Sequence, residues 1–289
     1  MLTAFMRWSF ATIVLVPRDR PFIRPDAAER RRTFAWAHAT GFTGIELADE
    51  WLDFTRLDHQ ALGETRKEIA DAGLQVSSLN IPRCHFTRES PAQHEMARID
   101  RALGAGPVLG AEVINLSLAA NPLSPDARPS ASRGMQATPE EFERAVETIT
   151  RLARLAAASG VRLVLELHDD GLLDTPELCL QLLRQVDSPA VRLNPDVANI
   201  CRGPGPLPDW RQALQLLAPH AGNWHVKNYR AGQPVALPDG DIDYATAWGL
   251  MRSAGYAGWV SIESRLGDVR TEQRAGLAYL QSLAARVVA

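Results

Sequence analysis

The sequence predicts an α/β protein of 289 residues that folds as a (β/α)8 TIM barrel. Short β-like runs alternate with longer helical segments from end to end, which implies parallel strands joined by crossover helices. Eight such units of about 36 residues each fill the chain without a linker, so we expect a single domain over residues 1–289. A doubly wound open sheet is the second choice, and no glycine-rich GxGxxG or GxxxxGKS/T loop follows a strand to support it.

The eight predicted strands are short apolar runs bounded by polar or turn-forming residues. In chain order they cover residues 6–10, 44–48, 74–80, 112–118, 161–167, 190–194, 222–227 and 258–263. The first lies in an apolar run that Ser9 and Thr12 interrupt, so we expect a strand there and not a signal peptide.

Two of the intervening helices have clear start signals. In "TPEEFERAVETITRLARLAAASG", Thr138 is a natural N-cap, a proline follows it, and Glu141 completes a capping box. Gly160 is placed to end that helix. Thr175 begins "TPELCLQLLRQV" with the same pattern.

Two loops are longer than a minimal barrel needs, at residues 117–136 and 201–212. Both follow predicted strands, and the loops after strands form the face of a barrel where active sites lie. The first loop is rich in Pro, Ser and Ala, and it is either a surface excursion or a lid over a substrate.

Composition narrows the class of protein. The net charge is −3 and no dense Lys/Arg run is present, so we expect no nucleic-acid partner. No segment approaches the roughly 18 apolar residues of a membrane span, so we expect no membrane association. The three cysteines have no disulfide or CxxC pattern, which is typical of free thiols in a reducing cytoplasm.

Polar residues gather where the last four predicted strands end. Side chains alternate along a strand, so Glu166 shares a face with His168, and His225 shares one with Asn223 and Lys227. By the same rule Ser261, Glu263 and Arg265 form one set, and Arg192, Asn194 and Asp196 form another. We therefore expect Glu166, Asp196, His225 and Glu263 at one rim of the barrel.

Several carboxylates at a buried rim repel one another unless a cation lies between them. Three carboxylates and one imidazole make an oxygen-rich site for one divalent ion, with Mn²⁺ favoured and Mg²⁺, Co²⁺ or Zn²⁺ as alternatives. Glu46, at the end of the second strand, either joins this site or pairs with an arginine. His85 follows the third strand, where it either contacts substrate or packs in the loop.

The chain resembles the xylose-isomerase-like barrels of the sugar isomerase/epimerase superfamily over nearly its whole length. The resemblance rests on "GFTGIEL", "LVLELH", "LNPDVAN", "WHVKN" and "GWVSIES", in this order and spacing. It implies that Glu166, Asp196, His225 and Glu263 are metal ligands and that the two glutamates also move protons. It further implies substrate contacts for His168, Lys227 and Arg230. Asn199 stands where some epimerases have a histidine, which places the ketohexose epimerase subgroup in doubt.

Together with the metal site, the resemblance implies a metal-dependent isomerase or epimerase that acts on a sugar or keto-sugar through an enediolate. In this hypothesis Glu166 and Glu263 are the acid/base pair, and Glu46, His85 and Asn199 are among the substrate-binding residues. A lyase that eliminates from a keto-sugar, inosose or 3-keto-glycoside is the first alternative, with His168 or Lys227 as the acid for the leaving group. A non-catalytic sugar-binding barrel or accessory subunit is the second. A homo-oligomer is compatible with the exposed barrel helices, although no stripe of residues specifies one.

Overall fold

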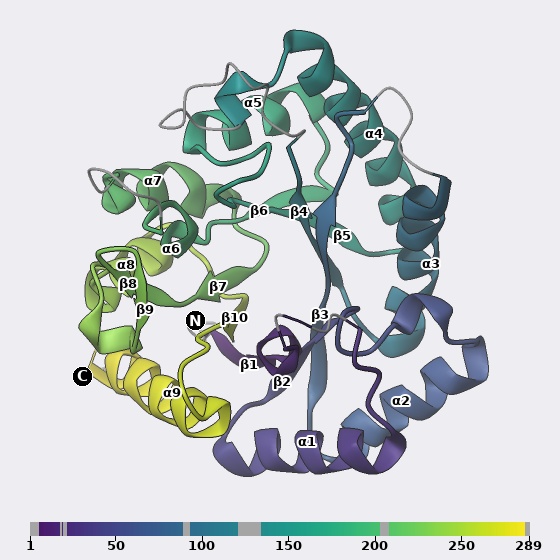
Figure 1. Cartoon of the computed structure of the whole chain (residues 1–289), viewed down its shortest axis with the longest axis vertical. Helices are drawn as coiled ribbons and strands as arrows, with labels where there is room; N and C mark the ends of the chain where they lie inside the picture. Colours follow the sequence, from purple (N-terminus) through teal and green to yellow (C-terminus); the bar gives the residue numbers. More distant parts are fainter. Residues whose placement is uncertain are drawn as a thin grey trace.

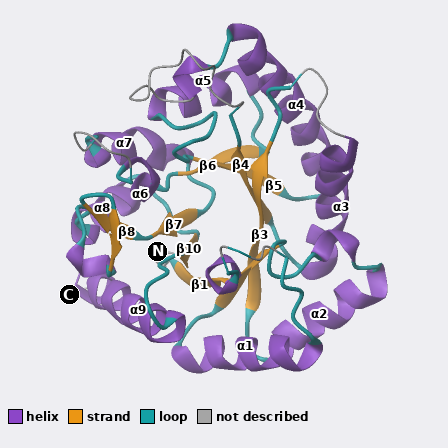
Figure 2. Ribbon diagram, viewed as in Figure 1, coloured by secondary structure: helices purple, strands orange, loops and turns teal. Residues whose placement is uncertain are grey.

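A parallel barrel surrounded by helices forms the centre of the molecule (Figures 1 and 2). The computed structural model describes residues 6–17, 19, 22–88, 93–120, 134–202 and 208–286. The strands of the barrel are β1 (Arg7–Ala11), β2 (Gly44–Ala48), β3 (Gln75–Cys84), β4 (Val113–Leu118), β5 (Arg162–Glu166), β6 (Val191–Asn194), β7 (Trp224–Val226) and β10 (Trp259–Ile262). All eight predicted strands are present, and the predicted fold class is confirmed.

Helices follow the strands and form the outer ring (Figure 2). They are α1 (Ala27–Thr40), α2 (His59–Asp71), α3 (Gln93–Leu109), α4 (Pro139–Ala158), α5 (Pro176–Val186), the short α6 (Val197–Ile200), α7 (Trp210–Leu217), α8 (Tyr244–Ser253) and α9 (Val269–Arg286). The capping box of Thr138 and Glu141 begins α4, and the Thr175 side chain caps α5, as predicted. None of the helices in the described residues is both long enough and apolar enough to span a membrane.

The strands pair in the order β6-β5-β4-β3-β2-β1-β10-β7, so the ring is nearly closed. Contacts between β6 and β7 span the remaining seam. The backbone N–H of Gly222 donates to the Leu193 carbonyl at 2.8 Å, and the His225 N–H donates to the Asn194 side chain at 2.9 Å. The amide side chain of Asn194 thus replaces a ladder acceptor at the seam and fixes the height of His225.

Strand β3 continues four residues beyond its predicted end at residue 80. Pro82 has no N–H, but the strand survives because the Ser117 hydroxyl accepts the Arg83 N–H at 2.9 Å. The Ala119 N–H then donates to the Cys84 carbonyl at 2.9 Å. The Ser117 side chain of β4 therefore accepts the hydrogen bond for which the β3–β4 ladder offers no backbone carbonyl.

The loop after β7 contains an antiparallel hairpin that the sequence did not predict, made of β8 (Asn228–Arg230) and β9 (Gln233–Val235). Of the two long predicted loops, residues 121–133 and 203–207 lie outside the described residues. Cys84, Cys179 and Cys201 are buried free thiols, as expected.

Polar side chains fill the middle of the barrel, where branched aliphatic residues are usual. They hydrogen-bond across the interior, for example Ser9 with Ser77 at 2.6 Å and Asn194 with Asn115 at 3.1 Å. Aliphatic and aromatic residues of opposite parity, such as Phe10 and Leu165, belong to the hydrophobic core instead. The barrel interior is therefore a polar hydrogen-bonded layer, and its residue Asn115 also donates to Glu166 of the predicted site.

Candidate metal centre and active site

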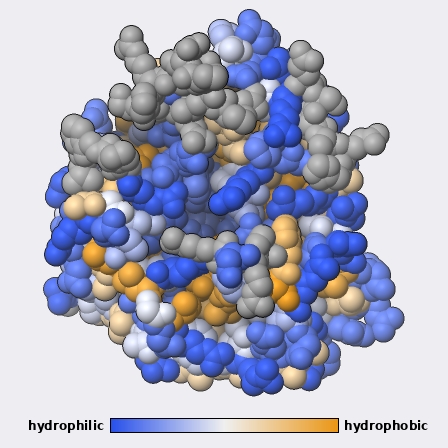
Figure 3. Space-filling model, in the orientation of Figure 1, coloured by the Kyte–Doolittle hydropathy of each residue, from blue (hydrophilic) through white to orange (hydrophobic). Residues whose placement is uncertain are grey.

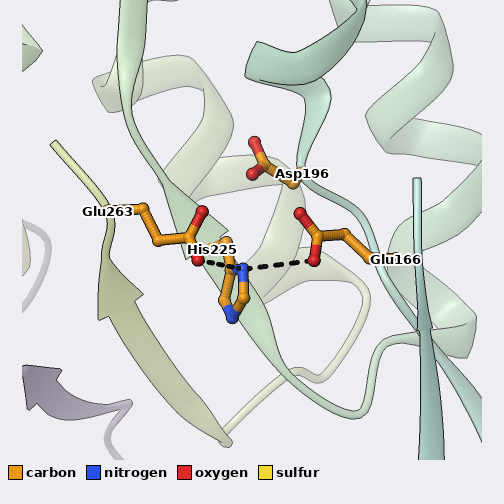
Figure 4. Close-up of side chains that lie close together, drawn as sticks. All are labelled: Glu166, Asp196, His225 and Glu263. Atoms are coloured by element: carbon orange, nitrogen blue, oxygen red, sulfur yellow. Dashed lines mark ion pairs between the residues drawn. The ribbon is translucent and has the colours of Figure 1, made fainter. Parts of the chain in front are cut away.

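The structure brings together the four residues predicted as metal ligands. Glu166 ends β5, Asp196 follows β6, His225 lies within β7 and Glu263 follows β10. One ligand atom from each lies within 4.8 Å of the others, and the side chains turn toward a shared space (Figure 4). On the face shown in Figure 3, hydrophilic residues gather around the centre of the molecule.

Asp196 and Glu263 share one cation, the ammonium group of Lys227. Its Nζ lies 2.6 Å from Asp196 Oδ2 and 2.8 Å from Glu263 Oε2. The other oxygen of Asp196 caps α6 by accepting the Ala198 N–H at 3.2 Å. Tyr244 fixes the lysine backbone, because its hydroxyl accepts the Lys227 N–H and donates to the Lys227 carbonyl. The predicted Lys227 therefore lies within the site, and Tyr244 is a supporting residue that the sequence did not indicate.

His225 presents its two nitrogens to different partners. Nε2 lies 2.9 Å from Oε2 of Glu46, which is completely buried and also accepts from Ser78 at 2.5 Å and Asn223 at 3.1 Å. Nδ1 faces the carboxylates, 3.1 Å from Glu263 Oε1 and 3.7 Å from Glu166 Oε2. Glu46 thus lies behind the imidazole, and none of the ion pairs among the described residues joins it to an arginine.

Two asparagines hold the Glu166 carboxylate. Asn115 donates to Oε2 at 2.9 Å, and Asn199 donates to Oε1 at 3.0 Å and to the Leu167 carbonyl at 2.9 Å. Asn199 has no exposed surface. Asn115 is a residue that the sequence analysis missed, although its inward parity in β4 is the same signal that identified the ligands.

Burial and charge act in opposite directions on the titratable groups of the site. Burial raises the pKa of Glu166, but the His225 imidazolium outweighs it and holds this pKa at about 2. Glu263 has a pKa well below its usual range, since His225 and Lys227 overcome its burial. The surrounding carboxylates likewise overcome burial and raise the pKa of both His225 and Lys227. At Asp196 burial prevails over Lys227 and raises the pKa to about 6.

The donor atoms fit a divalent cation. Nδ1 of His225 is buried and, although it lies 3.1 Å from Glu263 Oε1 as an ion pair, it has no hydrogen-bond partner among the described residues. Because Nε2 is turned to Glu46, a neutral imidazole that donates there has its lone pair on Nδ1, as in a metal ligand. Ligands about 2.1 Å from an ion lie at most about 4.2 Å apart, so the 4.8 Å spread requires a contraction of only about 0.6 Å. Three carboxylates with Lys227 carry a charge of −2, which a divalent ion neutralises.

The remaining predicted residues lie on loops or strands beyond the barrel. His168 is partly exposed, and its Nδ1 contacts the carbonyl of Asp169 at 2.5 Å. Asp169 forms an ion pair with Arg202, an arginine that the sequence analysis did not select. Arg230 is exposed in β8. His85 follows β3, and its buried Nδ1 has no hydrogen-bond partner among the described residues. The described contacts do not join His168, Arg230 or His85 to the four clustered residues.

Fold and site together define the class of protein. A family model described as xylose isomerase-like TIM barrel matches residues 34–283. The chain therefore belongs to the xylose isomerase-like TIM barrel family.

Solved structures with the same fold include enzymes that act on sugars. A xylose isomerase-like TIM barrel protein from Mycobacterium smegmatis, in complex with magnesium, aligns with a TM-score of 0.81 at 22% identity over 99% of this chain and 98% of that one. An L-ribulose 3-epimerase aligns with a TM-score of 0.76 at 21% identity, over 98% of this chain and 97% of that one. The probable 3-DHS dehydratase AsbF from Bacillus anthracis, involved in petrobactin synthesis, aligns with a TM-score of 0.75 at 18% identity. The alignment covers 96% of this chain and 99% of that one. A search of curated protein sequences finds no match.

Proposed function

We propose that the chain is a divalent-metal-dependent isomerase or epimerase that acts on a small sugar or keto-sugar. The observation that carries the proposal is the placement of Glu166 and Glu263 on two sides of His225, facing one shared space (Figure 4). Two carboxylates arranged in this way suit removal of a carbon-bound proton by one and its return by the other. The fold shared with an L-ribulose 3-epimerase supports the same reaction class.

Glu166, Asp196, His225 and Glu263 would hold the ion, with Mn²⁺ our first choice among oxygen-preferring metals. When bound, a divalent ion supplies Lewis-acid polarisation of the substrate carbonyl and its neighbouring hydroxyl. The protein fixes the reacting groups, because Asn115 and Asn199 hold Glu166 while Lys227 holds Glu263.

We propose different roles for two of the predicted substrate-binding residues. Glu46 and Asn199 have no exposed surface, so we assign them to orienting His225 and Glu166 instead of touching substrate. Lys227 keeps its proposed contact with substrate. His168, His85 and Arg230 stay proposed contacts as well, since they lie on segments that follow the carboxyl ends of β5, β3 and β7.

A lyase is the second candidate, and the ammonium group of Lys227 is the observation that favours it. Lys227 Nζ lies 2.8 Å from Glu263 with 10% of its side chain exposed, where it could donate a proton to a leaving hydroxyl or glycosyl oxygen. The similarity in fold to a probable dehydratase agrees with this reading.

The test is to incubate the metal-loaded chain in D₂O with a panel of ketoses, inososes and 3-keto-glycosides. Deuterium incorporation into carbon reports proton abstraction, and the products separate isomerisation or epimerisation from elimination. Glu166→Gln and Glu263→Gln should each abolish the exchange, whereas Glu147→Gln, an exposed position in α4, should leave it unchanged. Sugar binding without exchange would instead indicate a non-catalytic barrel, and full turnover by either site variant would refute the role assigned to that residue.

A further inference from the structure

A cavity of about 700 Å³ lies at the end of the barrel opposite the metal centre. It is lined by the first residues of five barrel strands, namely Arg7, Gln75, Val113, Arg162 and Trp259. The metal centre lies at the carboxyl ends of the strands, so the cavity and the metal centre lie at opposite ends of one barrel.

The cavity is strongly basic. Arg7, Arg66, Arg162 and Arg192 line it, and Glu112 is the one acidic residue among the described residues that do so. The lining charge is therefore +3 (four arginines and one glutamate). Arg162 shares the strand parity of Glu166, and Arg192 shares that of Asp196, so both belong to the inward-facing set. Barrel interiors are ordinarily closed by branched aliphatic residues, which makes arginines at this level unusual.

The charge of these arginines is largely uncompensated. Arg162 lies 3.7 Å from Glu112, but both side chains are about half exposed or more, so the pair contributes little. Arg7 stacks on the Trp259 ring, 4.1 Å from its centroid, and Arg66 donates to the Val108 carbonyl at 3.3 Å. Within the described part of the chain no carboxylate pairs with Arg7, Arg66 or Arg192.

Gly222 packs closely against Arg192 of β6, with no room for a larger side chain. A Cβ at Gly222 would lie 2.7 Å from Arg192 Cβ and 2.8 Å from Val164 Cγ2, closer than real Cβ atoms approach. Gly222 therefore lets the stem of Arg192 pack against the seam between β6 and β7, where the residue lines the cavity.

We infer that this cavity binds a small organic phosphate. Guanidinium groups match phosphate oxygens in a bidentate manner, and a dianionic phosphate can satisfy more than one of them at once. The cavity exceeds the size of an inorganic ion and lies in the range of small-molecule sites. Gln75, whose side chain is exposed in the cavity wall, provides a hydrogen-bonding group for the non-phosphate part of the ligand. This site is independent of the reaction proposed at the metal centre.

Isothermal titration of the metal-loaded full chain with glycerol 3-phosphate tests the inference. Glycerol, citrate and sodium chloride at matched ionic strength are the comparison titrants. We expect glycerol 3-phosphate to bind with a Kd below about 1 mM, and the others to bind at least tenfold more weakly or not at all.

Arg162→Gln and Arg192→Gln should each weaken the binding of glycerol 3-phosphate at least tenfold. Arg162 is half exposed, so its substitution should leave folding intact, which circular dichroism would check. Arg154→Gln, at an exposed arginine of α4 outside the cavity, is the matched control and should bind as the parent does. No binding by the parent chain, equal binding of citrate, or unchanged affinity in both cavity variants would each overturn the inference. If glycerol 3-phosphate bound at the metal centre instead, both cavity variants would keep the affinity of the parent, and the inference would be overturned.

Discussion

Substitution of Glu46 by Gln removes one charge from behind His225 while it keeps the shape of the side chain. In the parent chain Glu46 Oε2 lies within hydrogen-bond distance of His225 Nε2 (2.9 Å), the Ser78 hydroxyl (2.5 Å) and the Asn223 amide (3.1 Å). Glutamine has one acceptor oxygen, and its NH₂ group would then face another donor, the Asn80 amide, 3.4 Å from Oε1. The variant therefore holds the imidazole less firmly, and its neutral amide oxygen stabilises a proton on Nε2 less than the carboxylate does.

The expected result is weaker metal binding. Loss of a residue that orients a metal-bound histidine costs about tenfold to a hundredfold in affinity, which corresponds to about 1.4–2.7 kcal/mol. Competition with a chelating indicator would measure the Mn²⁺ Kd of the parent and of Glu46→Gln. Glu64→Gln, at an exposed position of α2, is the control and should bind as the parent does.

A second readout separates this positioning role from a general loss of stability. The ¹⁵N shifts of the His225 ring should show Nε2–H in the metal-bound parent and a mixed or altered protonation state in Glu46→Gln. If the variant folds, binds Mn²⁺ within twofold of the parent and keeps the same ring tautomer, the reasoning about Glu46 is refuted.

Three further outcomes follow from the structure. Because the carboxylates raise the pKa of His225, Mn²⁺ must displace its proton at neutral pH. Affinity should therefore rise with pH, by up to about tenfold per unit, in titrations above the Asp196 pKa of about 6, and a flat profile would contradict this. Arg98→Ala leaves the buried Asp49 carboxylate without its ion pair, and chemical denaturation should show a loss of about 3 kcal/mol. Burial raises the pKa of Asp49 to about 6 even with Arg98 present, so Asp49 should become protonated and neutral as the pH falls below 6. The loss in the free energy of unfolding caused by Arg98→Ala should then become smaller. A loss that stays constant with pH would count against the explanation. Thr138→Ala removes the N-cap of α4 and should lower the free energy of unfolding by about 1 kcal/mol, whereas no change in the denaturation midpoint would show that the capping box is dispensable.

The barrel and the four clustered residues could be predicted because both depend on simple periodicities. Alternation along a strand fixes the face of a side chain, and parallel strands bring their carboxyl ends to one rim. Glu166 and Glu263 are far apart in the chain, but Glu166 ends one apolar strand and Glu263 directly follows another. The same rule applies to Asn115, which was missed because an amide in isolation suggests no chemistry.

Other features depend on contacts that no local pattern contains. The β8–β9 hairpin is three residues per strand, too short for a period-two signal. The extension of β3 past Pro82 depends on the hydroxyl of Ser117 in the neighbouring strand. The basic cavity needs Arg7, Arg162 and Arg192 to lie at the same end of the nearly closed barrel, which is visible only after the strands are registered against one another.

The central claim is that one divalent ion binds between the last strands of the barrel. Anomalous diffraction from crystals soaked in Mn²⁺ tests it most directly. The account predicts a single strong peak bonded to His225 Nδ1 and to carboxylate oxygens of Glu166, Asp196 and Glu263. A peak elsewhere, or no peak with the Lys227 ammonium still between Asp196 and Glu263, would contradict it.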